Sequence, residues 1–197
     1  AMDIFEVTLR GRGGHAAQPH MAIDPLVGAT ALVQAWQSIV SRMVDPQDAA
    51  VLSVTQIHAG NAWAVIPEEV VIRGTVRSFK PAVQALIERR MREMGEAYAT
   101  AHELLLTWRY EHRFPPTVNS EAETRFAAGV AAGLLGAANV HDATPSMGSE
   151  DFGWMLQVQR GCYAWLGSAG QPGCLLHNPY YDFNDAVIPL GASYWVR

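Results

Sequence analysis

Four short stretches of this chain hold side chains that could take part in chemistry. They are residues 13–20, 73–77, 147–152 and 177–185. The first and the last contribute His15 and His177, and imidazole suits proton transfer, hydrogen-bond donation and metal ligation. The second ends at Arg77, whose guanidinium suits the binding of a carboxylate. These stretches therefore point to acid–base, metal or anion-binding chemistry.

Each stretch also has an interpretation without chemistry. His15 is compatible with an exposed loop and Arg77 with an ordinary surface position. Ser149 can cap a helix that begins near Glu150, with acids in its first turn. Residues 177–185 can form a polar surface loop, although their density of His, Asn, Asp and Tyr is hard to explain by packing. No stretch makes a catalytic site alone, because a catalytic zinc needs about three protein ligands.

The composition excludes several classes of protein. The chain has 197 residues, enough for one large or two small domains, and 49% of them are hydrophobic. Charged residues are only 17%, against roughly 25% in an average soluble domain, so we expect a partner subunit or further chain to cover some surface. A net charge of −5 argues against nucleic-acid binding, which needs a basic face. No apolar run reaches the roughly 18 residues of a membrane span.

Two cysteines, Cys162 and Cys174, are too few for a disulfide framework. They are compatible with a reducing compartment, and no basic stretch followed by an apolar one suggests a signal peptide. We therefore expect a cytoplasmic location. The abrupt start, with a strand-like pattern directly after Ala1 and Met2, predicts a truncated chain.

The first part of the chain predicts an alternation of strands and helices. Expected strands are residues 3–12, 50–59, 70–78 and 103–112, and expected helices are residues 25–44 and 81–100. The order strand–helix–strand–strand–helix–strand predicts a ferredoxin-like fold, α/β (α+β) in class. Its four-stranded antiparallel sheet should carry both helices on one face.

The first predicted helix has an unusual surface. Asp24 and Pro25 suit its start, and Leu26, Val33, Trp36 and others form its expected core side. Ala31, Leu32 and Ala35 flank that side, and no charged residue occurs between Pro25 and Ser41. We therefore expect this helix and a neighbouring edge strand to pair with a second copy of the chain. The alternative is that residues 114–197 of the same chain cover this helix.

A boundary is expected at residues 113–117, where Pro115 and Pro116 interrupt regular structure. This predicts two domains, residues 3–112 and 114–197. The second should contain helices at residues 120–135, 150–156 and from 188 onward, with a strand at 162–166. So few strands do not make an independent domain, and the region is expected to belong to a larger α/β layer structure.

Taken together and in this order, the motifs resemble those of one family. They are Gly-Gly-His-Ala-Ala-Gln-Pro-His at 13–20, Val-Ile-Pro-Glu-Glu at 65–69, Arg-Gly-Thr-Val-Arg at 73–77, Met-Gly-Ser-Glu-Asp-Phe at 147–152 and His-Asn-Pro-Tyr-Tyr-Asp-Phe-Asn-Asp at 177–185. The whole chain resembles the latter half of dinuclear metal-dependent amidohydrolases of the aminoacylase type. These include hippurate hydrolase, N-acyl-amino-acid amidohydrolase and auxin-conjugate hydrolases.

The resemblance implies a role for each part. Residues 3–112 would be a lid or dimerisation domain, and residues 114–197 the closing part of a catalytic domain whose N-terminal part is absent. His177 would bind one of two divalent ions (zinc, manganese, cobalt or nickel). His15 would reach into the active site of the neighbouring subunit of a homodimer and stabilise the oxyanion. Arg77 would bind the carboxylate of an N-acyl amino acid.

Gly148 and Ser149 would line the substrate pocket. The family usually has Asn where this chain has Ala64, so Asn61 is the candidate for that polar contact. The family's early metal-binding segment does not occur here. Its Glu-Glu pair, in which one glutamate is the general base, is also missing, since Glu68 and Glu69 sit in a turn before a strand. The chain alone is therefore expected to be inactive and to bind no stoichiometric metal. The alternative is a non-catalytic ferredoxin-like dimerisation or binding module.

Overall fold

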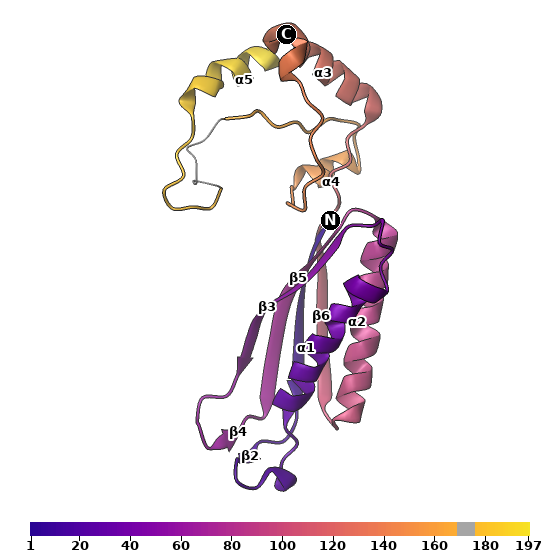
Figure 1. The fold of residues 1–197 in the computed structure, drawn as a ribbon, viewed down its shortest axis with the longest axis vertical. Helices are drawn as coiled ribbons and strands as arrows, with labels where there is room; N and C mark the ends of the chain where they lie inside the picture. Colours follow the sequence, from indigo (N-terminus) through magenta and orange to yellow (C-terminus); the bar gives the residue numbers. More distant parts are fainter. Residues whose placement is uncertain (169–175) are drawn as a thin grey trace. The chain divides into compact units, whose positions relative to one another are not determined.

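The computed structural model describes residues 1–168 and 176–197, which divide into two compact units (Figure 1). The first unit comprises Ala1–Pro116 together with Met147–Gly153. The second comprises Thr117–Ser146 and Trp154–Arg197. In the described part of the chain, no helix has the length and apolar character needed to cross a membrane.

The first unit is built on a four-stranded antiparallel sheet. Its strands are β1 (Met2–Arg10), β3 (Ala50–Ala59), β5 (Glu69–Ser78) and β6 (Leu105–Phe114), in the spatial order β3-β5-β1-β6. Phe5, Val7 and Leu9 alternate inward along β1, as a sheet with one covered face requires. The helices α1 (Pro25–Arg42) and α2 (Pro81–Ala101) cover that face (Figure 1). The predicted order of strands and helices is confirmed.

Trp36 joins the two helices to the sheet. It is fully buried, and its indole N–H donates to the carbonyl oxygen of Met91 in α2 at 3.1 Å. Its ring meets those of Phe5 and Trp108 edge-on, with centroids 5.5 and 6.5 Å apart. The predicted core side of α1 was wrong at two positions: Leu32 is fully buried, whereas Leu26 lies partly exposed.

A buried carboxylate closes one end of the sheet. Asp3 is almost fully buried, and it accepts hydrogen bonds from the Tyr110 hydroxyl at 2.8 Å and the Gln84 amide at 2.7 Å. Burial, and then the charge of Asp3, raise the pKa of Tyr110, so the phenol remains a donor. His112 lies between Asp3 and Glu88, at 3.2 and 3.1 Å. The buried charge is therefore satisfied by β6 and α2.

Two differences from the predicted elements have local causes. The strand β6 begins at Leu105, because Glu103 takes a left-handed φ of 57° and ends α2 with a turn. Between the predicted elements lies a small ladder in which β2 (Gly14–His15) pairs with β4 (Val65–Ile66). This ladder could not be predicted from the sequence, because glycines and a proline beside its strands are unusual in strands.

The second unit consists of short helices joined by irregular chain. Its helices are α3 (Glu121–Leu135), η2 (Ala137–Asn139), η3 (Asp185–Val187) and α5 (Ile188–Trp195), and it shares α4 (Phe152–Leu156) with the first unit. The short helix η1 (Pro19–Met21) belongs to the first unit. Neither α3 nor α5 contains a buried residue, and Phe126 in α3 is 73% exposed. These helices expose apolar side chains that a larger structure would cover.

The strand predicted at residues 162–166 is not observed. The segment instead hydrogen-bonds to a side chain. The Asn119 amide accepts from the Tyr163 backbone N–H and donates to its carbonyl oxygen, each at 2.8 Å. The Asn119 side chain thus makes the two hydrogen bonds that a neighbouring strand would make. A β-ladder needs a second strand, so this segment does not form one. Cys162 is a free thiol, and Cys174 lies outside the described residues.

Two glycines of the first unit should respond to alanine in opposite ways. A Cβ at Gly74 in β5 would overlap the Ser53 carbonyl oxygen and the Phe5 ring. A Cβ at Gly95 in α2 would meet only Leu106, at an ordinary 3.6 Å. We expect Gly74→Ala to lower the free energy of unfolding by at least about 2 kcal/mol and Gly95→Ala to raise it by about 0.5–1 kcal/mol. Urea midpoints measure both, and equal shifts would contradict this packing.

Candidate functional site

His15 lies at one end of the first unit, on the β2–β4 ladder. The register pairs His15 with Val65, and the Ala16 N–H donates to the Ala64 carbonyl oxygen at 2.9 Å, which extends the ladder by one step. The backbone N–H of Ala17 donates to Nδ1 of His15 at 3.1 Å. A backbone N–H can only donate, so Nδ1 is an acceptor and the neutral ring carries its proton on Nε2. His15 therefore presents an exposed Nε2–H donor.

Glycines allow the backbone to pack closely around this ladder. A Cβ at Gly13 would approach the Ile66 carbonyl oxygen to 2.9 Å, closer than real side chains come. An open pocket of about 630 Å³ lies beside the ladder, and its lining includes Gly13, Gly14 and Asn61. The structure thus brings Asn61 and the His15 ladder to one end of the unit.

Arg77 lies at the other end of the same sheet. It is next to last in β5, where Met2 and Val51 are its register partners on either side. Its Nη1 is buried and has no hydrogen-bond partner among the described residues. Leaving a buried cationic N–H unpaired is costly. This arrangement favours an anion, such as a carboxylate, as the missing partner of Arg77.

The structure does not bring His15 and Arg77 together within one chain. The ladder of His15 joins β5 near Glu69, and Arg77 is eight residues further along that strand. At roughly 3.3 Å per residue, these positions are about 26 Å apart along the strand. Figure 1 shows β2 and β4 at the end of the sheet opposite to the N-terminus. Any single site that uses both residues therefore needs two copies of the first unit.

Gly148 and Ser149 belong to the segment Met147–Gly153, which groups with the first unit. Next to Ser149, the Glu150 carboxylate accepts from the Phe152 N–H at 3.3 Å, at the start of α4. A hydrogen bond from Asp151 to Glu150, and then the charge of Glu150, raise the pKa of Asp151.

His177 belongs to the second unit, where it begins an exposed turn. Its φ is 70°, an uncommon backbone conformation for a residue with a side chain. Asn178 closes the turn by accepting from the backbone N–H groups of Tyr180 and Tyr181, each at 2.9 Å. Such strained positions gather at functional sites, which is consistent with a ligand role.

The described residues do not fit a metal centre by themselves. In residues 1–168 and 176–197, no group of three or more His, Cys, Asp or Glu side chains could hold a metal ion. His177 alone would give only one of the roughly three ligands that a catalytic zinc needs. A dinuclear centre would therefore need ligands in addition to the described residues.

Trp63 is a residue that the sequence analysis did not single out. It occupies the turn before β4 and is 103% exposed. The sequence held no clear signal for it, because the ladder that brings this turn near His15 was not predicted. An isolated exposed tryptophan at such a position is typical of a contact surface.

Comparison with known proteins identifies the family of this chain. The model of Peptidase family M20/M25/M40 matches residues 15–197, and the chain belongs to this family. It is 36% identical to the IAA-amino acid hydrolase ILR1-like 2 of Arabidopsis thaliana, over 96% of this chain and 44% of that protein. It is 35% identical to the hippurate hydrolase of Campylobacter jejuni, over 99% of this chain and 51% of that protein.

A solved structure shows the same likeness. A dinuclear metal binding peptidase of the M20 family from Bacillus subtilis, the YXEP protein, superposes with a TM-score of 0.78 at 25% identity. The match covers 99% of this chain and 48% of that one. The chain spans about half the length of the curated relatives it matches.

Proposed function

We propose that the protein containing this chain hydrolyses the amide bond of N-acyl or N-aroyl amino acids. In this proposal the first unit is a ferredoxin-like lid and dimerisation domain, and the second unit completes a catalytic domain that carries two divalent metal ions. The observation that carries the proposal is the geometry of His15. Its Nδ1 accepts a backbone N–H, so its Nε2–H is free to meet a substrate oxygen. Family membership supports the same chemistry.

The proposed role of His15 is to stabilise developing charge. When the amide carbonyl becomes tetrahedral, its oxygen gains negative charge, and a positioned N–H donor stabilises that oxygen more strongly than the ground-state carbonyl. The donor is held by the ladder and by the Ala17 N–H, so little reorganisation is needed. Arg77 would bind the carboxylate of the amino acid, because a guanidinium can form two parallel hydrogen bonds with it.

This proposal requires a homodimer. An N-acyl amino acid holds its scissile carbonyl and its carboxylate only three bonds apart, whereas His15 and Arg77 are about 26 Å apart along one sheet. The two residues can meet one substrate only if they come from different copies. We infer that each active site takes His15 from one subunit and Arg77 from the other.

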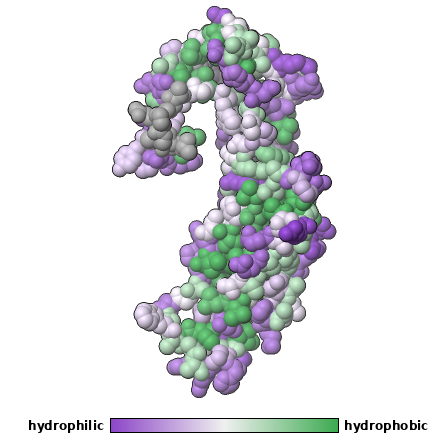
Figure 2. Space-filling model, in the orientation of Figure 1, coloured by the Kyte–Doolittle hydropathy of each residue, from purple (hydrophilic) through white to green (hydrophobic). Residues whose placement is uncertain are grey.

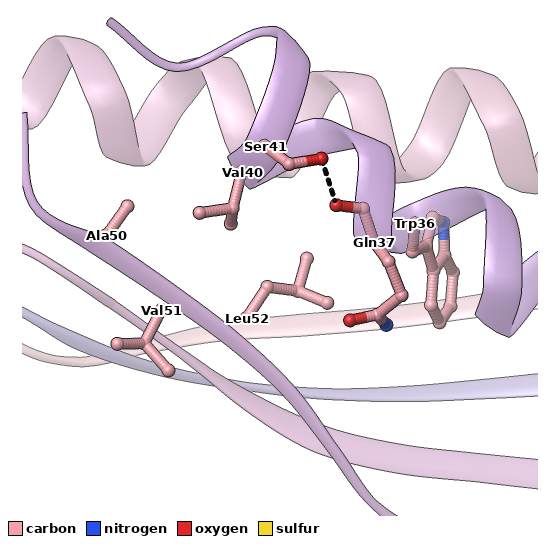
Figure 3. Close-up of a pocket in the computed structure, with 7 residues that line it drawn as sticks. All are labelled: Trp36, Gln37, Val40, Ser41, Ala50, Val51 and Leu52. Atoms are coloured by element: carbon pink, nitrogen blue, oxygen red, sulfur yellow. Dashed lines mark hydrogen bonds between the residues drawn. The ribbon is translucent and has the colours of Figure 1, made fainter. Parts of the chain in front are cut away.

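The surface around α1 and β3 supports such a pairing. The strand β3 is an edge of the sheet, and edge strands are normally covered or paired. The outer face of α1 presents Thr30, Gln34, Gln37 and Ser41, all uncharged, and apolar residues are visible over α1 and β3 (Figure 2). A groove of about 300 Å³ separates this helix from residues 50–52 of β3 (Figure 3). Depletion of charge is typical of interface cores.

A charge placed on this face should separate the subunits. We expect light scattering of the 197-residue chain at tens of micromolar to give the mass of two chains. Gln34→Lys should lower this mass to that of one chain, because an unpaired ammonium buried in the interface would strongly destabilise the dimer. Ala97→Lys, on the charged outer face of α2, is the control and should remain dimeric. A monomeric parent chain would contradict the dimer.

The function itself is tested with the whole protein. We expect release of glycine from hippurate, or of an amino acid from another N-acyl derivative, together with bound divalent metal. The 197-residue chain alone should release none. A whole protein that forms dimers, binds no metal and cleaves no N-acyl amino acid would support the non-catalytic binding module instead.

A further inference from the structure

Trp63 is exposed to an extent that needs an explanation. The whole indole is open to solvent, and its neighbours Ala62 and Ala64 are small and exposed themselves. Exposing so large an apolar surface forgoes the burial that usually holds a tryptophan in a fold. The turn that carries Trp63 is nevertheless anchored, because Ala64 accepts a backbone hydrogen bond and Ile66 is buried. A rigid turn thus presents an aromatic ring outward.

The ladder places Trp63 beside His15. Paired residues of an antiparallel ladder lie on the same face, so Val65 accompanies His15, and Val65 is 53% exposed. The hydrogen bond between Ala16 and Ala64 continues the ladder by one step. Trp63 lies two residues before Val65, in the turn next to this step. An aromatic side chain can span the roughly 7–8 Å that separates diagonal positions of a ladder, so the indole can reach the neighbourhood of His15. An apolar surface therefore borders the Nε2–H donor.

We propose that Trp63 binds the acyl group of the substrate and sets a preference for apolar, above all aromatic, acyl groups. This inference rests on the proposed function. If the Nε2–H of His15 meets the scissile carbonyl oxygen, the acyl group is bonded directly to that carbonyl carbon and lies next to the ladder. Trp63, Ala64 and Val65 give this part of the surface three uncharged side chains, while Arg12 and Glu68 line the adjoining pocket. This part of the surface suits an aryl or alkyl group, with which an indole makes stacked or edge-to-face contacts.

The amino-acid part of the substrate is a poorer match for this surface. It carries a carboxylate, and we have assigned that charge to Arg77, which comes from the other copy. A charged group gains nothing from an indole and two small apolar neighbours, whereas an acyl group loses no hydrogen bond on leaving water. Trp63 is thus a specificity-determining residue for the acyl side.

The test measures kcat/KM of the whole protein for two substrate series. One series keeps glycine and varies the acyl group from acetyl through hexanoyl to benzoyl, and the other keeps benzoyl and varies the amino acid. We expect Trp63→Ala to lower kcat/KM for benzoylglycine by at least about 10-fold, mainly through KM, with little change for acetylglycine. Trp63→Phe should retain most of the benzoyl preference. Leu105→Ala, another exposed apolar residue of the first unit, is the control.

The possible outcomes distinguish a failure of the acyl assignment from a failure of the proposed function. Absence of hydrolysis of every substrate by the parent protein would overturn the proposed function itself. Hydrolysis that Trp63→Ala lowers equally for all acyl groups would overturn the acyl assignment and indicate a contact with the partner subunit. A changed preference for the amino acid, with an unchanged preference for the acyl group, would also overturn it.

Discussion

Replacing His15 by alanine is expected to lower kcat of the whole protein by roughly 10²–10³-fold, as removal of an oxyanion donor does in other enzymes. Metal content should stay full, because the ladder presents His15 as a hydrogen-bond donor whose Nδ1 is already engaged by Ala17. Steady-state kinetics and metal analysis of the same preparation measure both quantities.

The contrast is with His177→Ala, which should deplete bound metal together with activity, because a lost ligand weakens the centre. His20→Ala is the matched control, since His20 is exposed in the same region but lies in η1, outside the ladder. Equal metal loss in the His15 and His177 variants would mean that the two roles are assigned wrongly.

Mixing two inactive variants is expected to restore activity. In a dimer of one His15→Ala chain and one Arg77→Ala chain, one site combines the intact Arg77 of the first chain with the intact His15 of the second. The other site lacks both. Random exchange of subunits makes half of the dimers mixed, so activity should reach about a quarter of the parent value for a two-fold symmetric dimer. The separation of His15 and Arg77 along β5 makes this the only productive combination.

Two further mixtures check the geometry. Two different substitutions of His15, such as His15→Ala and His15→Phe, should give no recovery, because every site then lacks its donor. Recovery should also vanish when Gln34→Lys is added to both chains. Absence of recovery from the His15 and Arg77 mixture, with subunit exchange shown by mass, would place both residues in one subunit's site and contradict the two-copy arrangement.

The sequence predicted the main elements of the first unit because their patterns are long and locally determined. Asp24 and Pro25 start α1, as expected, and the alternation along β1 matches its burial. The β2–β4 ladder was missed, since two residues per strand give no periodicity. The strand at 162–166 was predicted from apolar residues alone, but a strand also needs a partner strand, and here the Asn119 side chain bonds to the Tyr163 backbone instead.

The candidate site was only partly predictable for a related reason. Residue types and motifs identified His15, Asn61 and Arg77, but their separation depends on sheet register, which pairs Arg77 with Met2 from the far end of the chain. The protonated nitrogen of His15 depends on the local turn that brings the Ala17 N–H to Nδ1. Trp63 became a candidate only when its exposure was known.

The pairing of Met2 with Phe114 has a consequence for protein engineering. These residues are register partners at the adjoining ends of β1 and β6, so the first 114 residues start and finish side by side. A unit with neighbouring ends can be transplanted into a surface loop of another protein or circularly permuted, because a short linker can join its ends. A permuted version with Phe114 linked to Met2 and new ends at Lys80 would keep every strand pairing of the sheet.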